Sequence, residues 1–303
     1  MKIKELWNKI RKGVKAGMAA ATESNVLTDN RVVSMIEKFK ASGKYKLMQE
    51  GERYYQADND IKNRKITRKV DGHKEEETWR ANNKLAHAKY KIQVDEKIAY
   101  LLTKPVTYKT DGTDKNDTYV EKVKDVLGKH FQYQLTQLGY EASNKGIGWL
   151  HVYLDPEGEL KTIVIPAEQC IPYWSDRSHT ELDAMIRVYN TTVWQYNQEK
   201  EITNVEIWTK DGVKYYRLEG QMLVYDNDKS MDAGGPVAHY KSVEEWKTWG
   251  KVPFIPFKNN QIEMPDVKFV KSLIDGYDLG RSEAANYMDE VKNLIFVLKL
   301  FRS

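Results

Sequence analysis

The amino-acid sequence predicts an α+β fold in which helices and antiparallel strands are combined with one long C-terminal helix. Apolar residues recur at helical spacing around residues 90–101 and again through residues 266–299. Between these helices, residues 149–218 change to short β-rich runs joined by turn signals. A chain of 303 residues, 41% of them hydrophobic, suffices for one large core or two smaller ones.

The composition narrows the class of protein before any motif is considered. No run approaches the roughly 18 apolar residues that a membrane span needs, so we expect no membrane partner. The N-terminus is basic but lacks the apolar core and cleavage site of a secretory signal. The single cysteine, Cys170, excludes an internal disulfide and suits a reducing compartment. We therefore expect cytosolic synthesis.

Charge is unevenly distributed along the chain, whose net charge is +4. Residues 1–100 carry 23 Lys and Arg against 14 Asp and Glu, a net charge of +9. Residues 101–303 carry 25 against 30, a net charge of −5. A basic N-terminal third favours a polyanion or an acidic protein as partner, and a solvated basic helix face explains it equally well.

Helices are predicted near the N-terminus. Residues 2–15 form a basic amphipathic pattern, which can lie on a membrane, on nucleic acid or, most commonly, on the protein itself or a neighbouring subunit. A second helix is expected over residues 29–41, with Thr28 or Asp29 as its N-cap and Gly43 as its end.

The next segments are more polar. Residues 50–65 are aromatic, acidic and predicted to be helical. Residues 67–78 form a charged connection with a turn at Asp71-Gly72. In this connection Glu75-Glu76-Glu77 is best explained as a solvated helix start, with weak metal binding as the alternative.

A helix followed by an extended segment is predicted over residues 82–108. Apolar side chains at Tyr90, Val94, Ile98 and Leu101 have the spacing of one buried helical face. Pro105 ends the helix, and the β-branched and aromatic residues that follow predict a strand over 106–108. We therefore expect this helix to dock on a sheet edge.

The middle of the chain combines one more helix with hairpins. A long amphipathic helix is expected from about residue 118 to the glycines at 146 and 148. Residues 149–154 and 160–165 form a predicted hairpin around an Asp-Pro-Glu-Gly turn. Further strands are expected at 184–189, 205–209 and 213–218, the last two joined by Lys-Asp-Gly, and residues 246–258 are expected to be irregular.

The last helix carries a seam of apolar residues with alternating spacings of four and three, interrupted at Arg281. Gly276 and Gly280 weaken it as an isolated helix, so it needs packing partners. The predicted subunit-packing seam consists of Val270, Ile274, Tyr277, Ala284, Met288, Val291 and Ile295.

A search for catalytic chemistry finds no candidate residues. The chain lacks GxxxxGK[ST] and GxSxG, and its one GxG, Gly146 to Gly148, has no third glycine. The six histidines are scattered and none neighbours Cys170, which disfavours a zinc site. The carboxylates at 155, 157 and 159 suit a solvated hairpin turn. We therefore expect no catalytic residue, no metal site, no cofactor and no enzymatic activity.

Five segments resemble one known family in the same order. They are YYQADNDIKNRK from Tyr54, NNKLAHAKYKIQVDEKIAYLLTKPVTY from Asn82, ASNKGIGWLHVYLDPEGELKTIVIPAEQCIPYWSD from Ala142, WGKVPFIPFKNNQ from Trp249 and VKSLIDGYDLGRSEAANYMDE from Val270. Together they resemble the portal proteins of tailed bacteriophages, in the branch found in siphophages and prophages of Gram-positive bacteria.

The resemblance implies a homo-oligomeric ring of about 12 subunits at the capsid portal vertex of the virion, assembled in the host cytoplasm. It implies that double-stranded DNA passes through without sequence-specific contacts, and that the partners are the large terminase, scaffold, major capsid and head–tail adaptor proteins. Residues 1–200 would form a wing of helices and antiparallel hairpins, 201–265 a β-rich, clip-proximal region, and 266–303 the stem helix. Lys268, Lys271 and Lys292 are the candidates for facing DNA in the channel, although solvated lysines or inter-subunit ion pairs explain them as well.

The chain departs from this family pattern at its C-terminus. It stops about where a tunnel loop would begin, before the second wing helix and crown, so we expect a C-terminally shortened portal protein. Two other hypotheses remain. A monomeric, phage-derived protein could bind nucleic acid through its basic N-terminal third, with salt-sensitive affinity. A nuclease would need a carboxylate set that the sequence does not suggest.

Overall fold

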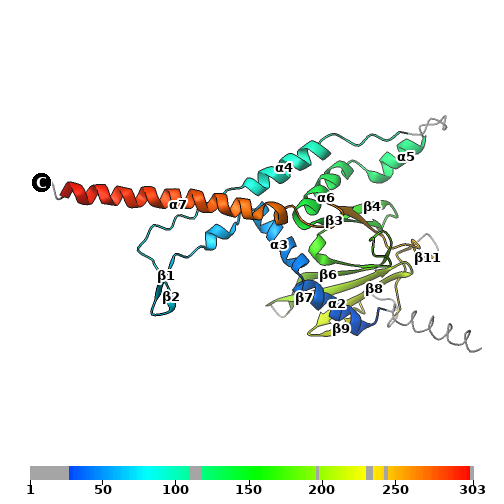
Figure 1. The fold of residues 1–303 in the computed structure, drawn as a ribbon. Coiled ribbons are helices and arrows are strands. Elements are labelled where there is room, and N and C mark those ends of the chain that lie inside the picture. The colour runs from blue at the N-terminus through cyan, green and yellow to red at the C-terminus, as the bar shows by residue number, and fades with distance from the viewer. Residues whose placement is uncertain (1–26, 110–117, 196–197, 230–234, 242–244, 301–303) are drawn as a thin grey trace, which may run out of the picture.

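The computed structural model describes residues 27–109, 118–195, 198–229, 235–241 and 245–300, with side chains described as far as Lys292 in the last helix. The predicted helix over 2–15 lies outside these ranges. Helices and antiparallel sheets form a body from which one helix, α7 (Val267–Leu300), projects a long way (Figure 1). The predicted α+β class is confirmed.

The larger sheet has five antiparallel strands in the order β5-β6-β7-β8-β9. One face is covered by α2 (Asp29–Ala41), whose Val32 and Ile36 pack on Ile186, Val205 and Ile207. The sheet continues across residue 200, where the wing was expected to give way to the clip-proximal region. Its strands are β5 (Cys170–Trp174), β6 (Leu182–Gln195), β7 (Gln198–Thr209), β8 (Gly212–Glu219) and β9 (Met222–Tyr225).

The second sheet has three antiparallel strands in the order β12-β3-β4. The predicted hairpin is confirmed as β3 (Ile147–Leu154) and β4 (Leu160–Ile165). The segment expected to be irregular contributes β12 (Phe254–Lys258), which pairs with β3. Trp149, Met185 and Phe254 share one core, so both sheets and the helices between them pack as one body.

The helices that join the body to α7 form a third core. Tyr54 of α3 (Gly43–Tyr55), Tyr90 of α4 (Lys89–Leu102) and Ile274 of α7 are buried together. A Cβ added at Gly51 would lie 1.9 Å from the carbonyl oxygen of Asn144, so α3 and α6 (Phe131–Lys145) touch backbone to backbone there. The remaining short elements are η1 (Asp60–Asn63), β1 (Thr67–Val70), β2 (His73–Glu76), α5 (Thr118–Leu127), η2 (Ala167–Gln169), β10 (Tyr240–Lys241) and β11 (Trp246–Lys247).

Several local predictions are wrong. Residues 106–108 do not form a strand, and α4 packs on other helices rather than on a sheet edge, with Leu101 59% exposed. The single helix expected over 118–146 is two helices, because Gly128 has a φ of +70° and breaks it. Gly43 does not end α2; Ser42 does, and its hydroxyl accepts a hydrogen bond from Tyr45 N, capping α3.

Two further differences concern residues 50–78. The helix expected over 50–65 ends at Tyr55, and η1 follows after a turn. The charged connection is a hairpin, β1–β2, in which Asp71 and Gly72 have φ values of +49° and +83°. Positive φ at both turn positions is what a two-residue type I′ hairpin requires. The turn was therefore predicted correctly and the strands were missed.

Candidate functional site: the anchor of helix α7

The long helix is fixed at its start by a buried carboxylate. Glu263, only 3% exposed, pairs with Lys44 of α3 at 2.7 Å, with His179 at 2.8 Å and with Lys258 of β12 at 3.2 Å. Burial alone would raise the pKa of Glu263, but the hydrogen bonds to Lys44 and His179 outweigh it and lower the pKa to about 2. Three separate parts of the body therefore converge on the residue that precedes α7 by one turn.

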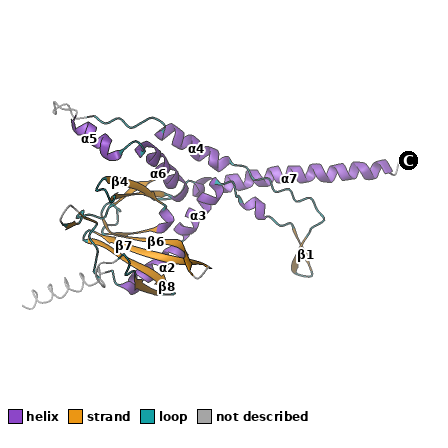
Figure 2. Ribbon diagram, turned by 180° about the vertical axis from the view of Figure 1, so that it is seen from behind, coloured by secondary structure: helices purple, strands orange, loops and turns teal. Residues whose placement is uncertain are grey.

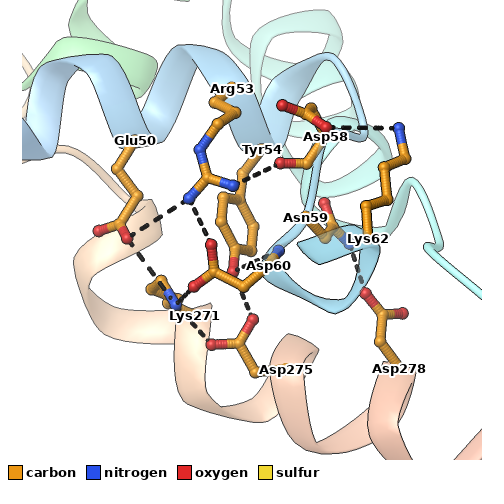
Figure 3. A network of polar contacts seen from close by, with 10 residues as sticks. All are labelled: Glu50, Arg53, Tyr54, Asp58, Asn59, Asp60, Lys62, Lys271, Asp275 and Asp278. Atoms are coloured by element: carbon orange, nitrogen blue, oxygen red, sulfur yellow. Dashed lines mark hydrogen bonds and ion pairs between the residues drawn. The ribbon is translucent and has the colours of Figure 1, made fainter. Parts of the chain in front are cut away.

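One turn into α7, Lys271 lies among three carboxylates (Figure 3). Its Nζ is 2.5 Å from Asp60 Oδ2, 2.6 Å from Asp275 Oδ2 and 3.7 Å from Glu50 Oε1. Burial would lower the pKa of Lys271, yet hydrogen bonds to Asp275 and Asp60 raise it above its ordinary value. Arg53 adds a second cation, 2.5 Å from Asp60 Oδ1. The cluster joins α3, η1 and α7.

Tyr54 lies between this cluster and the third hydrophobic core. Its ring is fully buried and its hydroxyl donates to Asp275, while Asp60 N donates to the same hydroxyl at 3.4 Å. Burial, followed by the hydrogen bond to the Asp275 carboxylate, raises the pKa of Tyr54 to about 12. The tyrosine therefore stays protonated and fixes the distance between α3 and α7.

Further along α7, an extended segment of residues 82–88, here called the strap, lies on three polar side chains. Asn83 N donates to Asn286 Oδ1 at 2.6 Å, and Leu85 N donates to Ser282 Oγ at 3.0 Å. His87 N donates to Asp278 Oδ1 at 3.1 Å. Asp278 and Ser282 are fully buried and Asn286 is 4% exposed.

The geometry of the strap follows from two repeat lengths. Alternate residues of an extended chain lie about 6.6 Å apart, and residues four apart on a helix lie about 6 Å apart. Backbone N–H groups at 83, 85 and 87 can therefore meet side chains at 286, 282 and 278 in succession. The strap runs antiparallel to α7 and satisfies its own backbone donors without a sheet.

Asp278 has partners besides the strap backbone. Besides the His87 backbone, it is contacted by His87 Nδ1 at 3.0 Å and accepts from Asn59 Nδ2 at 2.5 Å. Asn59 also donates to His87 O at 3.0 Å. The fully buried carboxylate thus links the residue before η1, the strap and α7.

Ion pairs flank the strap at the more exposed end of the contact. Arg64 pairs with Glu283, and Arg80 Nε lies 3.5 Å from Glu290 Oε1. Asn83 Nδ2 donates to Asp289 Oδ2 at 2.9 Å. These contacts are solvent-accessible and contribute less than the buried ones.

The opposite side of α7 has no such cover. Along residues 269–287, at helical spacing, Phe269 is 56% exposed, Leu273 74% and Tyr287 70%. On the same side, a Cβ added at Gly276 or Gly280 would have no heavy atom within 4 Å. Helix α7 therefore has a polar, anchored side and a largely apolar, exposed side, which we call the outer face (Phe269, Leu273, Gly276, Gly280 and Tyr287). The ion pair of Glu283 with Arg64 lies at its edge.

The predicted site residues include both buried and exposed positions of α7. Lys271 belongs to the carboxylate cluster, whereas Lys268 and Lys292 are exposed. Of the predicted seam, Ile274 is buried and Val270 half-buried against the chain's own helices. Tyr277, Ala284 and Met288 are exposed, Val291 is half-buried, and the side chain of Ile295 lies outside the described part.

Sequence reasoning missed the anchoring set of Tyr54, Asp278, Ser282 and Asn286. The last three recur every four residues, which is a signal for one helix face, but polar residues at that spacing are usually assigned to solvent. Their partners lie about 200 positions away in sequence, so no local pattern identifies them.

The described residues contain no group of three or more His, Cys, Asp or Glu placed to hold a metal ion. Among the same residues, none of the helices combines the length and the apolarity that crossing a membrane requires.

Comparison with known proteins identifies the class to which this fold and anchored helix belong. A sequence profile described as "Phage portal protein, SPP1 Gp6-like" matches residues 40–302. The chain belongs to this family of phage portal proteins.

Two relatives show how much of the family pattern is present. The portal protein of Bacillus phage SPP1 is 32% identical over 268 residues, which are 88% of this chain and 51% of the relative. The portal protein of Clostridium phage phiCD119 is 31% identical over 258 residues, 82% of this chain and 53% of the relative. The chain therefore spans about half the length of these curated relatives.

The anchor also accounts for the family-like segments recognised in the sequence. In the segment that starts at Val270, five polar positions contact the two segments that start at Tyr54 and Asn82. Three sequence-distant motifs are thus parts of one interface. The five positions are Lys271, Asp275, Asp278, Ser282 and Asn286.

Proposed function

We propose that this chain is a portal subunit that assembles into a ring, the conduit for double-stranded DNA at one vertex of the capsid during packaging and ejection. The observation that carries the proposal is the two-sided character of α7. One side is fixed to its own subunit by buried polar contacts, and the outer face is largely apolar and exposed. Exposed apolar surface of this kind marks a protein interaction site.

The outer face suits packing against neighbouring copies. Gly276 and Gly280 lack side chains, so another helix can approach closely between the bulkier Leu273 and Tyr287. A helix that contains two glycines is weak alone and gains stability from such packing. In a closed ring, every subunit would cover the outer face of the next one.

Channel contacts with DNA would be few and independent of sequence. Lys268 and Lys292 remain candidates for facing phosphate, since both are exposed on α7. Lys271 is a weaker candidate because its ammonium already pairs with three carboxylates. Sparse phosphate contacts would allow DNA to slide.

The domain assignment stays part of this proposal. Residues 1–200 would form most of the wing, 201–265 a clip-proximal region and 266–303 the stem. The ring would stand in the virion after assembly in the host cytoplasm, and its partners would be the large terminase, scaffold, major capsid and head–tail adaptor proteins. The structural nature of the family supports a role without catalysis.

A double variant of the outer face tests the proposal. Leu273→Asp with Tyr287→Asp should prevent ring formation, because two charges would be buried at each contact between subunits. Sedimentation velocity measures the loss of the ring. Tyr100→Asp in α4, where the side chain is 89% exposed, is the matched control and should leave the ring intact. Assembly of the double variant as efficiently as the control would contradict the proposal.

A further inference from the structure

The hairpin β1–β2 is a separate structural feature of this chain. Seven of its eight strand residues are exposed and only Val70 is partly covered. It contributes no residue to the three hydrophobic cores of the described chain. In both views it stands clear of the sheets and of α7 (Figures 1 and 2). A two-stranded hairpin is only marginally stable by itself in water, so it needs further contacts.

The base of the hairpin is held firmly even though its tip is free. Glu77 N donates to Ile66 O at 2.8 Å and closes the loop. On either side of the hairpin, Arg64 pairs with Glu283 and Arg80 with Glu290, both in α7. These ion pairs fix the position of the hairpin relative to α7, the helix whose outer face is exposed at Leu273 and Tyr287.

Two lysines of the hairpin have no carboxylate partner among the described residues. Lys69 and Lys74 are direct cross-strand partners, and among the described residues no carboxylate lies within 4.0 Å of either ammonium. Like charges placed opposite each other destabilise a strand pair. Beside the hairpin, Trp79 is 77% exposed. A pair of cations on the hairpin and an exposed tryptophan just beyond its base are surface that gains from a partner.

The charge pattern favours a protein partner over nucleic acid. The first strand is basic, with Arg68 and Lys69, whereas the second ends in Glu75-Glu76 and is followed by Glu77. Glu76 pairs with Lys65 and Glu77 with Arg68, which leaves Lys69, Lys74 and Glu75 without an ion pair among the described residues. Three consecutive carboxylates beside the two lysines would repel a phosphate backbone. In a ring, each subunit meets one neighbour on each side through different surfaces, so a basic edge and an acidic edge can both be complemented by identical copies.

We propose that β1–β2 and Trp79 form an arm that docks on a neighbouring copy of this chain and holds adjacent subunits together. The inference rests on the proposed ring and adds to it a second contact, continuous with α7 through Arg64, Arg80 and the strap. Among the described strands, β1 and β2 pair only with each other, so their outer edges offer backbone donors and acceptors that such a contact can satisfy.

The test is removal of the arm from the full chain. Because Ile66 O and Glu77 N are hydrogen-bonded, residues 67–76 can be replaced by Gly-Ser-Gly without moving the chain on either side. The matched control removes the equally long stretch 192–201 from the hairpin β6–β7, where most of the described side chains are also exposed, with the same linker. We expect arm removal to raise the concentration at which half the rings dissociate by at least about tenfold, with no change for the control.

A second variant distinguishes the loss of an inter-subunit contact from a folding defect. Lys69→Glu with Lys74→Glu keeps the arm and reverses its cation pair, and it should weaken the ring while thermal unfolding of the subunit stays that of the parent. Independently, mixing ¹⁴N- and ¹⁵N-labelled chains and treating them with an amine-reactive cross-linker should yield mixed-isotope links from Lys69 or Lys74, which only contacts between copies produce.

The outcomes separate the arm from the ring. Parent rings whose stability is unaffected by arm removal and by charge reversal would overturn the arm and leave the proposed function standing. Equal weakening by the β6–β7 control would also overturn it. A parent chain that does not self-associate would overturn both, and DNA affinity lost with Lys69 and Lys74 in such a monomer would assign the arm to nucleic acid.

Discussion

Asn286 in α7 accepts two hydrogen bonds from Asn83 in the strap, from the backbone N–H at 2.6 Å and from Nδ2 at 3.0 Å. These residues lie 203 positions apart. Their contact is the last of three in which a side chain of α7 receives a backbone donor of the strap. The projecting helix is thus joined to the strap by specific polar contacts, which fix its register more strictly than apolar packing would.

Asp278→Ala should release the strap. The substitution leaves the His87 N–H without its buried acceptor and removes one of the two acceptors of Asn59 Nδ2, so we expect a loss of about 2–4 kcal/mol in the free energy of unfolding. Urea titration measures it, and hydrogen exchange at the Leu85 and His87 amides should become faster. Asp289→Ala, an exposed carboxylate on the same helix, is the control and should cost under about 1 kcal/mol. Equal effects would contradict the role of Asp278.

Lys271→Met should destabilise the start of α7. Without the ammonium, Asp60 and Asp275 repel each other near the buried Tyr54, and the cost should be roughly 1–3 kcal/mol because the site is partly solvated. Lys268→Met is the control, since the Lys268 ammonium has only a weak contact with the sulfur of Met264. Thermal and urea unfolding of both variants provide the comparison, and an unchanged stability in Lys271→Met would exclude a structural role for the cluster.

Acid should weaken the contact at Glu263. The pKa of this group is about 2 in the folded chain against an ordinary 4.5, so the folded state binds fewer protons in that range. The stabilisation is complete above pH 4.5 and is lost as the pH falls towards 2, by roughly 3 kcal/mol in total. Glu263→Gln removes this titration, and the difference in stability between parent and variant should shrink by that amount on acidification. A constant difference would refute the assignment.

Gly51→Ala should destabilise although alanine favours helices. The added Cβ would lie 1.9 Å from Asn144 O, so α3 and α6 must separate, at a cost we expect to exceed about 2 kcal/mol. Gly43→Ala, in the same helix with no heavy atom within 4 Å, should be neutral or stabilising by up to about 1 kcal/mol. Opposite signs of the two effects in chemical denaturation are the expected result, and equal signs would show that the close approach is not rigid.

Much of the fold could be predicted where one local signal dominates. The period of α7 and the Asp-Pro-Glu-Gly hairpin were both predicted correctly. Residues 106–108 were not, because β propensity forms no strand without a partner edge. At β1–β2 the strands were missed, because their residues are mostly charged and have low β propensity. Only the turn between them indicates the hairpin.

The site was harder to predict than the fold. The seam read from spacing mixes two sides of α7: Ile274 packs inside the subunit, and Met288 is exposed. A periodic pattern shows which residues share one face of a helix. It does not show which face the rest of the same subunit will bury. The anchor depends on contacts between polar residues that lie more than 190 positions apart, and the pattern of a single sequence does not indicate which of them meet.

The most direct test of the ring is the mass of the purified chain in solution, measured by native mass spectrometry and light scattering over a range of salt concentrations. If the chain forms the proposed ring, the mass will be that of a closed assembly of about a dozen copies, with weak affinity for DNA. A stable monomer at every salt concentration, binding DNA with an affinity that falls steeply as salt rises, would contradict it and favour a nucleic-acid-binding protein.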